Sequence, residues 1–245
     1  DQPGRQVQDG ALCEEALGLP RPLCPLDGEV VVAHCRDRHA VDDHRLAELL
    51  EVEEDGPVPL ELVTECVALA QQAPTGSNIQ GWHFVVVTDP AKRAAVGDIY
   101  RRAFATYRGS PMYAGAIKTG DADRDAQQER VGSSADFLAE HMGEAPVLVI
   151  PCVQGRAKNP AAAAGLLGAI LPAAWSFMLA ARARGLGTCW TTLHLMHEQE
   201  TAELLGIPFE SVTQALLTPL AFTKGTDFKA AKRPDPSTIM HIDGW

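Results

Sequence analysis

Apolar residues recur at helical spacing after the first quarter of the chain. Leu62, Cys66 and Leu69 fall on one face of a helix expected over residues 60–73, and Pro59 stands where a helix can begin. A run of aromatic and β-branched residues over 82–87 then predicts a buried strand. The patterned part of the chain therefore begins with a helix followed by a strand.

The alternation continues at irregular intervals. Asp89-Pro90 is typical of a helix start, and we expect that helix to run through Tyr100. Gly185 and Gly206 stand where left-handed helix ends are expected. The remaining elements expected are strands over 147–150, 188–192 and 216–222 and helices over 172–184 and 198–205. Strands and helices in this irregular order predict an α+β layered domain.

Three stretches lack such a pattern. Residues 108–130 are polar and contain glycine, which predicts a mobile excursion over a site. Residues 1–55 are expected to form a divergent N-terminal segment ahead of one domain over 56–245. The tail from Lys229 to Trp245 has no period of its own, and we expect it to wrap around another part of the protein.

Residues 161–181 contain no charged side chain and are long enough to span a bilayer. They are rich in alanine and glycine, which supply little transfer free energy, and basic residues flank both ends. A helix buried in the core or at a subunit interface is the better prediction, so no membrane span is expected.

Charge and cysteine content narrow the function classes. The 245 residues include 21 Lys+Arg and 32 Asp+Glu, and the net charge of -11 argues against a nucleic-acid partner. The six cysteines form no C-x-x-C pair, which indicates reduced thiols in the cytoplasm. Residues 1–10 are polar and lack a signal-peptide core.

Common catalytic motifs are absent. The sequence has no G-x-S-x-G elbow, no phosphate-binding G-x-x-x-x-G-K-[ST] loop and no G-x-G-x-x-G helix start. Thr201 stands where a zinc-binding helix that began at His197-Glu198 would need its second histidine. Cys189 with His194 and His197 is not expected to bind a metal, and no side chain is assigned as a catalytic acid, base or nucleophile.

Three segments carry the positive signal. Residues 73–84 place small residues, a hydroxyl and the Asn78 amide in a turn, where backbone can approach a flat ligand. Residues 185–192 place two glycines before a strand, and residues 229–234 hold a concentrated basic stretch that suits a phosphate. The alternatives are a simple helix-to-strand connector, a helix end leading into a core strand, and a solvated tail.

Together these segments resemble the FMN-dependent nitroreductase family over about residues 57–245. The matching motifs in chain order are A-P-T-G-S-N-I-Q-G-W-H-F over 73–84, Glu144-Ala145-Pro146, Leu171-Pro172-Ala173, Leu179-Ala180-Ala181-Arg182, Gly185-Leu186-Gly187-Thr188, and a Gly225-containing loop before Lys232-Arg233-Pro234. Their occurrence in this order is more specific than any one of them.

The resemblance implies a central mixed β-sheet flanked by helices in an intertwined homodimer, with FMN between the subunits. It implies hydride uptake from NADH or NADPH and ping-pong reduction of nitroaromatic, quinone or related small-molecule acceptors. The cofactor-binding residues that it implies are Pro74, Thr75, Ser77 and Asn78 at the flavin ring or ribityl chain, Leu186 and Gly187 near the ring, Pro172 lining the pocket, and Lys232 and Arg233 at the phosphate. Trp82 and His83 are expected to pack behind the site.

One departure from the family pattern concerns residues 47–55. The family has arginines here that grip the phosphate, whereas this stretch is acidic and would repel it. Arginines at 36, 38 or 45 could substitute, Lys232 and Arg233 could suffice, or FMN could bind weakly. A non-catalytic FMN-binding or storage protein, and a related dehalogenase or flavin-fragmenting enzyme, therefore stay open as alternative functions.

Overall fold

The computed structural model describes residues 57–223 and 233–245, which belong to two separate compact units. The first part holds nearly all of the regular structure. Its helices are α4 (Leu60–Ala70), α5 (Pro90–Arg108), α6 (Ala122–His141), α7 (Pro160–Ala183) and α8 (Glu198–Leu205), and its strands are β1 (Trp82–Val87), β2 (Val147–Gln154), β3 (Leu186–Thr188), β4 (Val212–Gln214) and β5 (Thr218–Phe222).

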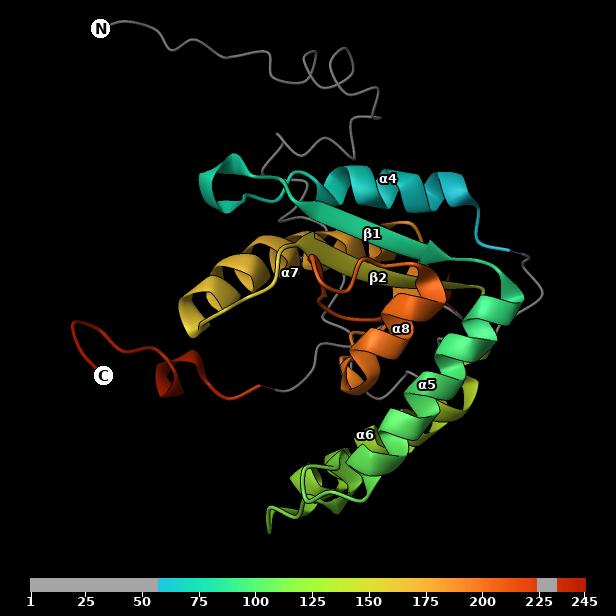
Figure 1. Cartoon of the computed structure of the whole chain (residues 1–245). Helices are drawn as coiled ribbons and strands as arrows, with labels where there is room; N and C mark the ends of the chain where they lie inside the picture. Colours follow the sequence, from blue (N-terminus) through green and yellow to red (C-terminus); the bar gives the residue numbers. More distant parts are fainter. Residues whose placement is uncertain (1–56, 224–232) are drawn as a thin grey trace, which may run out of the picture. The chain divides into compact units, whose positions relative to one another are not determined.

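The strands form one sheet in the order β1-β2-β5-β3, with β4 also paired to β2. Figure 1 shows β1 and β2 side by side. Every pairing among the described strands is antiparallel. The expected α+β architecture is confirmed, whereas the parallel pairing of a mixed sheet is not among the strands described. β4 and β5 follow each other along one side of β2, and Leu217 between them pairs with Thr191.

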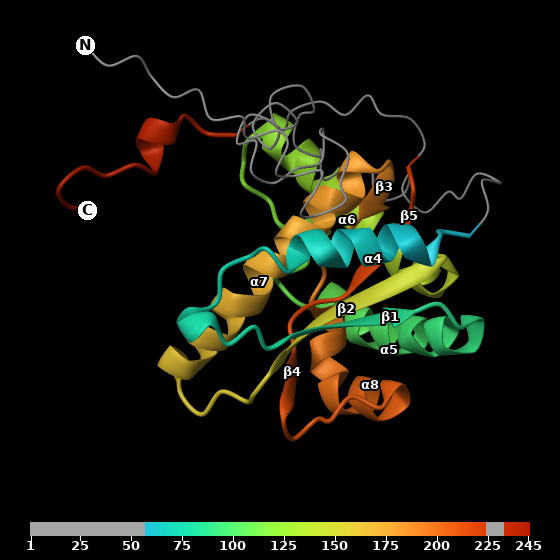
Figure 2. The ribbon, with the colours of Figure 1, turned by 90° about the horizontal axis from the view of Figure 1, so that it is seen from above.

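Strand β2 separates two cores because its side chains alternate between the faces of the sheet. Val147 and Val149 pack with α4 and α7 on one face, and Leu148 and Ile150 pack with α5, α6 and α8 on the other. Figure 2 shows α4 crossing α7 on its face of the sheet. Residues 147–153 are all buried, so β2 is the centre of the fold.

Several predicted boundaries are confirmed. Strand β1 spans the expected residues, and α8 ends at Gly206 with a φ of 72°. The Asp89 side chain accepts a hydrogen bond from Lys92 N at 2.8 Å, so it caps α5 with Pro90 in the first turn. Other expected elements occur with shifted ends: α4 ends at Ala70, α5 continues to Arg108, and β2 continues to Gln154. The strand expected over 188–192 was misplaced, because β3 spans Leu186–Thr188 and shares only Thr188 with that range.

The prediction of a mobile polar excursion over 108–130 was wrong in its second half, where α6 begins at Ala122. The Asp121 side chain caps this helix by accepting from Arg124 N at 2.8 Å. Its buried residues are mostly small, so apolar periodicity is weak. A methyl group at Gly132 would lie 2.8 Å from Gly115 Cα, which shows that α6 contacts the preceding turn through main chain.

The expected helix over 172–184 was placed too short. Helix α7 begins twelve residues earlier, where Asn159 accepts a hydrogen bond from Ala162 N at 2.9 Å and Pro160 occupies the first turn. Pro172 therefore lies inside a 24-residue helix. Among the described residues, α7 is the helix long and apolar enough to cross a membrane, and 22% of its most apolar 18-residue window is buried.

Candidate cofactor site

The turn that joins α4 to β1 has an unusual backbone. Ser77, Asn78 and Gln80 have φ angles of 53°, 54° and 52°, in the left-handed region that favours glycine. The glycines of the turn, Gly76 and Gly81, are not among the positive-φ residues. Such conformations cost free energy and cluster at ligand sites, so this turn is the first candidate for a binding site.

Hydrogen bonds within the turn hold this conformation. Gln80 N donates to Thr75 Oγ1 at 3.1 Å, and Gln80 Nε2 donates to Asn78 Oδ1 at 2.6 Å. Asn78 N donates to Thr75 O at 3.1 Å in a single 3-10 turn over 76–78. The Ser77 hydroxyl has no hydrogen-bond partner within the described chain, and Ser77, Asn78 and Gln80 are exposed.

Trp82 ties this turn to helix α7. Its indole Nε1 donates to Ala169 O at 3.0 Å, and its ring packs beside Ile170 and Val153. The main chain adds a second link, because Gln154 N donates to Gly81 O at 2.8 Å. Figures 1 and 2 both show the turn beside the N-terminal half of α7. Trp82 and His83 were both expected to pack behind the site: Trp82 packs behind this turn through a specific hydrogen bond, whereas His83 is exposed, so the prediction was wrong for His83.

The predicted residues of the first segment therefore lie together. Thr75 is half-buried, and Pro74, Ser77 and Asn78 are exposed on the same turn. Pro172 lies on the neighbouring α7, where it is exposed. Because proline has no N–H, it leaves the carbonyl of Gly168 without its usual helical donor.

The second predicted segment lies at the other end of α7. Leu186 and Gly187 form part of β3, which follows the C-terminal end of the helix (Figure 2). Leu186 is fully buried in the core on the α4 side of the sheet, so its side chain is unable to line a cavity. Gly187 is buried and pairs with Ala221 of β5. Within one chain, this segment and the Thr75–Gln80 turn are at opposite ends of α7.

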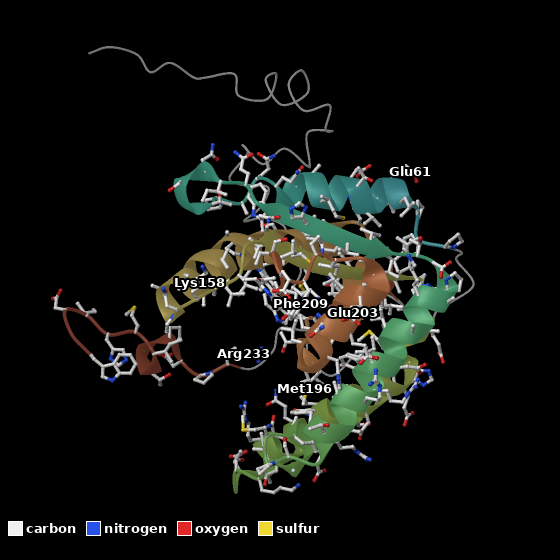
Figure 3. The ribbon with its side chains drawn as sticks, in the orientation of Figure 1. Glu61, Lys158, Met196, Glu203, Phe209 and Arg233 are labelled. Carbon is white, nitrogen blue, oxygen red and sulfur yellow. The ribbon has the colours of Figure 1, made fainter. Side chains whose placement is uncertain are left out.

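The third predicted segment is only partly described. Lys232 lies outside the described residues. Arg233, labelled in Figure 3, is exposed and belongs to the second described part. In that part, Asp235 accepts a hydrogen bond from Ser237 N at 2.9 Å and begins a short 3-10 turn. Each part is described by itself, and the role of Arg233 stays a prediction.

Two buried polar side chains deserve notice beside the predicted residues: Arg184 was not singled out in the sequence, and His194 was considered there only as a metal ligand. The Arg184 side chain is 6% exposed and donates from Nε to Glu65 Oε2 at 2.8 Å, which joins the end of α7 to α4, while its Nη2 is buried and has no hydrogen-bond partner among the described residues. His194 is fully buried, and neither ring nitrogen has a hydrogen-bond partner in the part of the chain that the structure describes. Burial lowers the pKa of His194 to about 4, so this imidazole is neutral near pH 7.

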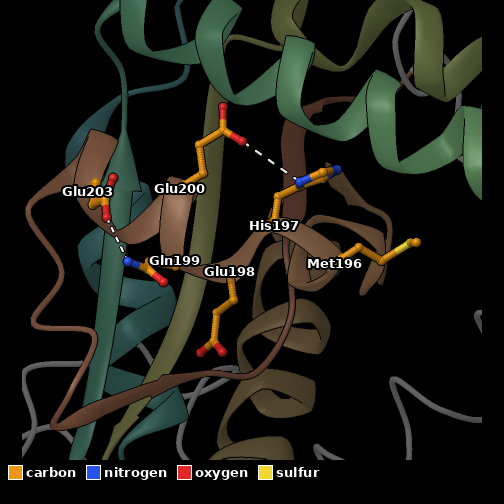
Figure 4. Close-up of a pocket in the computed structure, with 6 residues that line it drawn as sticks. All are labelled: Met196, His197, Glu198, Gln199, Glu200 and Glu203. Atoms are coloured by element: carbon orange, nitrogen blue, oxygen red, sulfur yellow. Dashed lines mark hydrogen bonds and ion pairs between the residues drawn. The ribbon is translucent and has the colours of Figure 1, made fainter.

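A shallow surface pocket of about 360 Å³ lies elsewhere, over the start of α8 (Figure 4). Its lining residues are Met196, His197, Glu198, Gln199, Glu200 and Glu203. The carboxylates have structural partners: Glu198 pairs with Arg156 at 2.7 Å, and Glu200 pairs with Arg102. An acidic lining is unsuited to a phosphate group. Within the described ranges, no group of three or more histidine, cysteine, aspartate or glutamate side chains could hold a metal ion.

Comparisons with known proteins agree with these observations. The sequence profile described as the nitroreductase family matches residues 54–220. A 4-nitrobenzoate reductase of Nocardioides sp. (strain LMS-CY) is 31% identical over 217 residues, which are 78% of this chain and 80% of that protein. A 5,6-dimethylbenzimidazole synthase of Rhodospirillum rubrum is 30% identical over 164 residues, which are 63% of this chain and 68% of that protein.

Solved structures share the fold at lower identity. An iodotyrosine deiodinase bound to FMN and 3-iodo-L-tyrosine gives a TM-score of 0.58 at 18% identity and covers 84% of this chain and 95% of its own. The FMN and NADPH-dependent nitroreductase NfnB from Sphigopyxis sp. strain HMH gives 0.56 at 18% identity and covers 87% of this chain and 99% of its own.

Proposed function

This chain belongs to the nitroreductase family, and we propose that it is an FMN-dependent oxidoreductase that uses NADH or NADPH to reduce nitroaromatics, quinones or related small acceptors. The observation that carries the proposal is the strained, exposed turn over Thr75–Gln80, which coincides with the family's cofactor motif. The relative that acts on 4-nitrobenzoate supports the acceptor class.

The turn fits a flavin in its chemistry. Residues 73–82 carry no charged side chain, and Thr75, Ser77 and Asn78 supply hydroxyl and amide hydrogen-bonding groups. A neutral, donor-bearing edge suits the carbonyl groups of a flat ring, and the open surface at Gly76 leaves space for close approach, since nothing lies within 4 Å of a methyl group placed there. We propose that Pro74 and these three residues hold the ring or ribityl chain.

The cofactor supplies the redox chemistry, which is reversible uptake of an electron pair from a nicotinamide and its delivery to the acceptor. The protein's residues then have three tasks: to bind the ring, to keep one face accessible and to place donors where negative charge develops. No side chain is assigned as a nucleophile, acid or base.

The phosphate needs a cation that the turn does not provide. We propose that Arg233, with Lys232, binds it, because charge-assisted hydrogen bonds are the strongest available for phosphate. The acidic residues 47–55 lie outside the described residues.

We propose that the functional unit is a homodimer formed through α7. One row of exposed residues along this helix follows alternating spacings of four and three, typical of a helix–helix seam. The row consists of Ala161, Gly165, Gly168, Pro172, Trp175 and Leu179, and Pro160, Ala164 and Leu167 of the same helix are exposed as well. Methyl groups added at Gly165 or Gly168 would have nothing within 4 Å, and Trp175 is 53% exposed, so the seam has room for a second helix.

A dimer also explains the separation of the predicted segments. The Thr75–Gln80 turn and the Leu186–Gly187 segment lie at opposite ends of α7, so we propose that each cofactor site combines residues of two chains. Coverage by a second copy is likewise our explanation for the apolar character of α7, rather than a membrane. The free thiols of Cys66 and Cys152 suit the cytoplasmic location that we propose.

A second candidate function comes from the other relatives. The 5,6-dimethylbenzimidazole synthase and the iodotyrosine deiodinase share the fold or the family and have different chemistry. A flavin-fragmenting or reductive dehalogenating activity is therefore the alternative, and a non-catalytic FMN-binding protein is a third.

An anaerobic titration, followed by admission of air to the reduced protein, separates these functions. Purified protein reconstituted with FMN should lose its visible flavin absorbance on addition of NADPH or NADH, and 4-nitrobenzoate or a quinone should restore it. Protein that fails to bind FMN contradicts the proposal, and bound flavin that neither nicotinamide reduces indicates a storage protein. Recovery with a halotyrosine but with no nitro compound or quinone indicates a dehalogenase, and flavin breakdown in air indicates the fragmenting reaction.

A further inference from the structure

The side chain of Gln80 controls which hydrogen-bonding group Asn78 presents to solvent. An asparagine amide has a carbonyl oxygen that accepts and an NH₂ that donates. Gln80 Nε2 donates to Asn78 Oδ1 at 2.6 Å, so the carbonyl side of this amide is occupied by a neighbour two residues away. The NH₂ side of Asn78 is left for a ligand.

Gln80 acts on Thr75 in the same sense. Its backbone N–H donates to Thr75 Oγ1 at 3.1 Å, which uses an acceptor site of that hydroxyl and leaves its proton available. Ser77, between them, has a hydroxyl without a partner within the described chain. Gln80 thus occupies acceptor oxygens of both Thr75 and Asn78. The hydrogen-bond donors of Thr75, Ser77 and Asn78 remain available to a ligand.

The backbone of Gln80 indicates that this arrangement is costly to keep. Its φ of 52° is a value that favours glycine, yet glutamine stands at this position and glycine stands at the next one, Gly81. A glycine at 80 would keep the backbone hydrogen bond and relieve the strain, but it would lose the contact with Asn78. Because Gln80 is exposed, packing in the core does not explain why a glutamine stands at this position.

We propose that Gln80 is a positioning residue that makes this turn a donor-only edge for the electron-rich form of the cofactor. This inference rests on the proposed function, since the ligand is taken to be FMN. Donors stabilise negative charge more than they stabilise a neutral ring, so the edge favours the reduced cofactor over the oxidised one. Gln80 acts through Asn78 and Thr75 and need not touch the ligand.

Two substitutions test the orientation. Gln80→Met removes both polar groups at similar length and frees the Asn78 amide to rotate. Gln80→Glu supplies acceptors only, so Asn78 should turn its NH₂ inward and present its carbonyl oxygen outward. We expect the Kd of oxidised FMN to rise several-fold in Gln80→Met and at least tenfold in Gln80→Glu. If the affinity for reduced FMN falls more than the affinity for oxidised FMN, the midpoint potential should fall by about 30 mV for each tenfold difference between the two losses.

Gln72 provides the matched control. It is an exposed glutamine just after α4 whose side chain reaches Ala68 O at 3.5 Å, so Gln72→Met and Gln72→Glu repeat the same chemical changes outside the turn. Both should keep the wild-type Kd and midpoint potential. All four variants should melt near the wild-type temperature, and a lower melting temperature with an unchanged potential would assign Gln80 a purely structural role.

The outcomes separate this inference from the proposed function. Wild-type protein that binds no FMN contradicts both. Wild-type protein that binds FMN while both Gln80 variants keep its Kd and potential contradicts the positioning role alone. In cofactor-free protein, side-chain amide NMR offers an independent measurement: the Gln80 NH₂ resonances should shift in Asn78→Ala, and unchanged resonances would contradict the contact.

Discussion

The indole of Trp82 donates a hydrogen bond to the main-chain oxygen of Ala169, 3.0 Å away in the middle of α7. This acceptor lies three residues before Pro172, which interrupts the helical hydrogen bonds at Gly168. The contact fixes the first residue of β1 against the helix at the point where its backbone is weakest. It also holds the strained turn, which ends at Gly81, beside the same helix.

Trp82→Phe should destabilise the protein by about 2 kcal/mol. The change removes one hydrogen bond, which contributes about 1 kcal/mol, and leaves a small gap beside Ile170 and Val153. Urea unfolding followed by circular dichroism measures this loss. Trp245→Phe is the control, because Trp245 is fully exposed and should leave stability unchanged. Equal stabilities for the two variants would show that the indole N–H does not hold α7.

Ser77→Gly should separate stability from cofactor binding. Glycine relieves the strain of the left-handed backbone at φ 53°, which stabilises the folded state. Glycine also gives the unfolded chain more conformational freedom, which offsets part of that gain. Stability should therefore stay level or rise by up to about 1 kcal/mol. FMN should bind more weakly by about 1 kcal/mol, because the hydroxyl is lost.

The control for this change is Ser133→Gly. Ser133 is exposed inside α6, where glycine lowers stability by about 0.5 kcal/mol, so the two substitutions should have opposite effects on unfolding. A stability loss in Ser77→Gly as large as that in Ser133→Gly would argue against strain in the turn.

Arg233→Ala should weaken FMN retention by roughly 1.5–3 kcal/mol, the usual scale of a hydrogen bond to a charged group. Fluorescence titration of cofactor-free protein gives the Kd. Lys92→Ala removes the same charge from an exposed position in the first turn of α5 and should leave the Kd unchanged. Equal affinities for Arg233→Ala and wild type would place the phosphate with other residues.

Trp175→Asp should dissociate the proposed dimer. A buried interface tryptophan commonly contributes 2 kcal/mol or more, so dimer affinity should fall by about thirtyfold or more, and FMN retention should fall with it. Analytical ultracentrifugation measures the association. Leu60→Asp introduces the same charge at an exposed leucine that begins α4 and should not change it. A variant Trp175→Asp that stays fully dimeric would rule out this face of α7 as the interface.

His194 should make stability depend on pH below neutrality. In the folded protein burial lowers its pKa from 6.5 to about 4, so between these values the unfolded chain binds a proton that the folded chain does not. Stability is therefore lost as the pH falls from 6.5 to 4, by up to about 3 kcal/mol, and this group has no effect above that window.

His194→Leu should flatten the stability profile between pH 6.5 and 4. It should cost little at pH 7.5, because the buried ring nitrogens make no hydrogen bond to any residue within 57–223 or 233–245. His83→Gln changes an exposed histidine and should keep the wild-type profile. If His194→Leu loses as much stability as the wild type between pH 6.5 and 4, other groups cause the acid sensitivity.

The sequence predicted those elements whose residues bury large apolar side chains or carry local signals. β1, α8 and the Asp89-Pro90 start of α5 are examples. Helix α6 escaped prediction because Gly132, Ser134 and Ala139 make its packing surface and leave no hydrophobic period. Strand β4 is three residues long and has no flanking signal of its own. Pro172 was taken as a helix start because its tolerance inside α7 depends on tertiary contacts such as that of Trp82.

The candidate site was predictable to a similar extent. The motif over 73–84 located the turn, because its residue types follow from close approach to a ligand. The positive φ angles at Ser77, Asn78 and Gln80 were not predictable, since glycine stands at 76 and 81 instead. The role of Gln80 was missed as well, although an amide pair two residues apart in a turn is a signal that could have found it.

The contact between Gly132 and Gly115 has a consequence for how this family member can vary. A side chain at Gly132 would meet the Gly115 main chain, 2.8 Å away, and would push α6 from the connection that precedes it, whereas a side chain at Gly115 would meet the Tyr113 ring at 2.7 Å. Natural or engineered changes in the length of the loop over residues 109–121 must therefore keep the contact between Gly115 and Gly132. Substitutions and insertions are better tolerated at Met112, which is exposed.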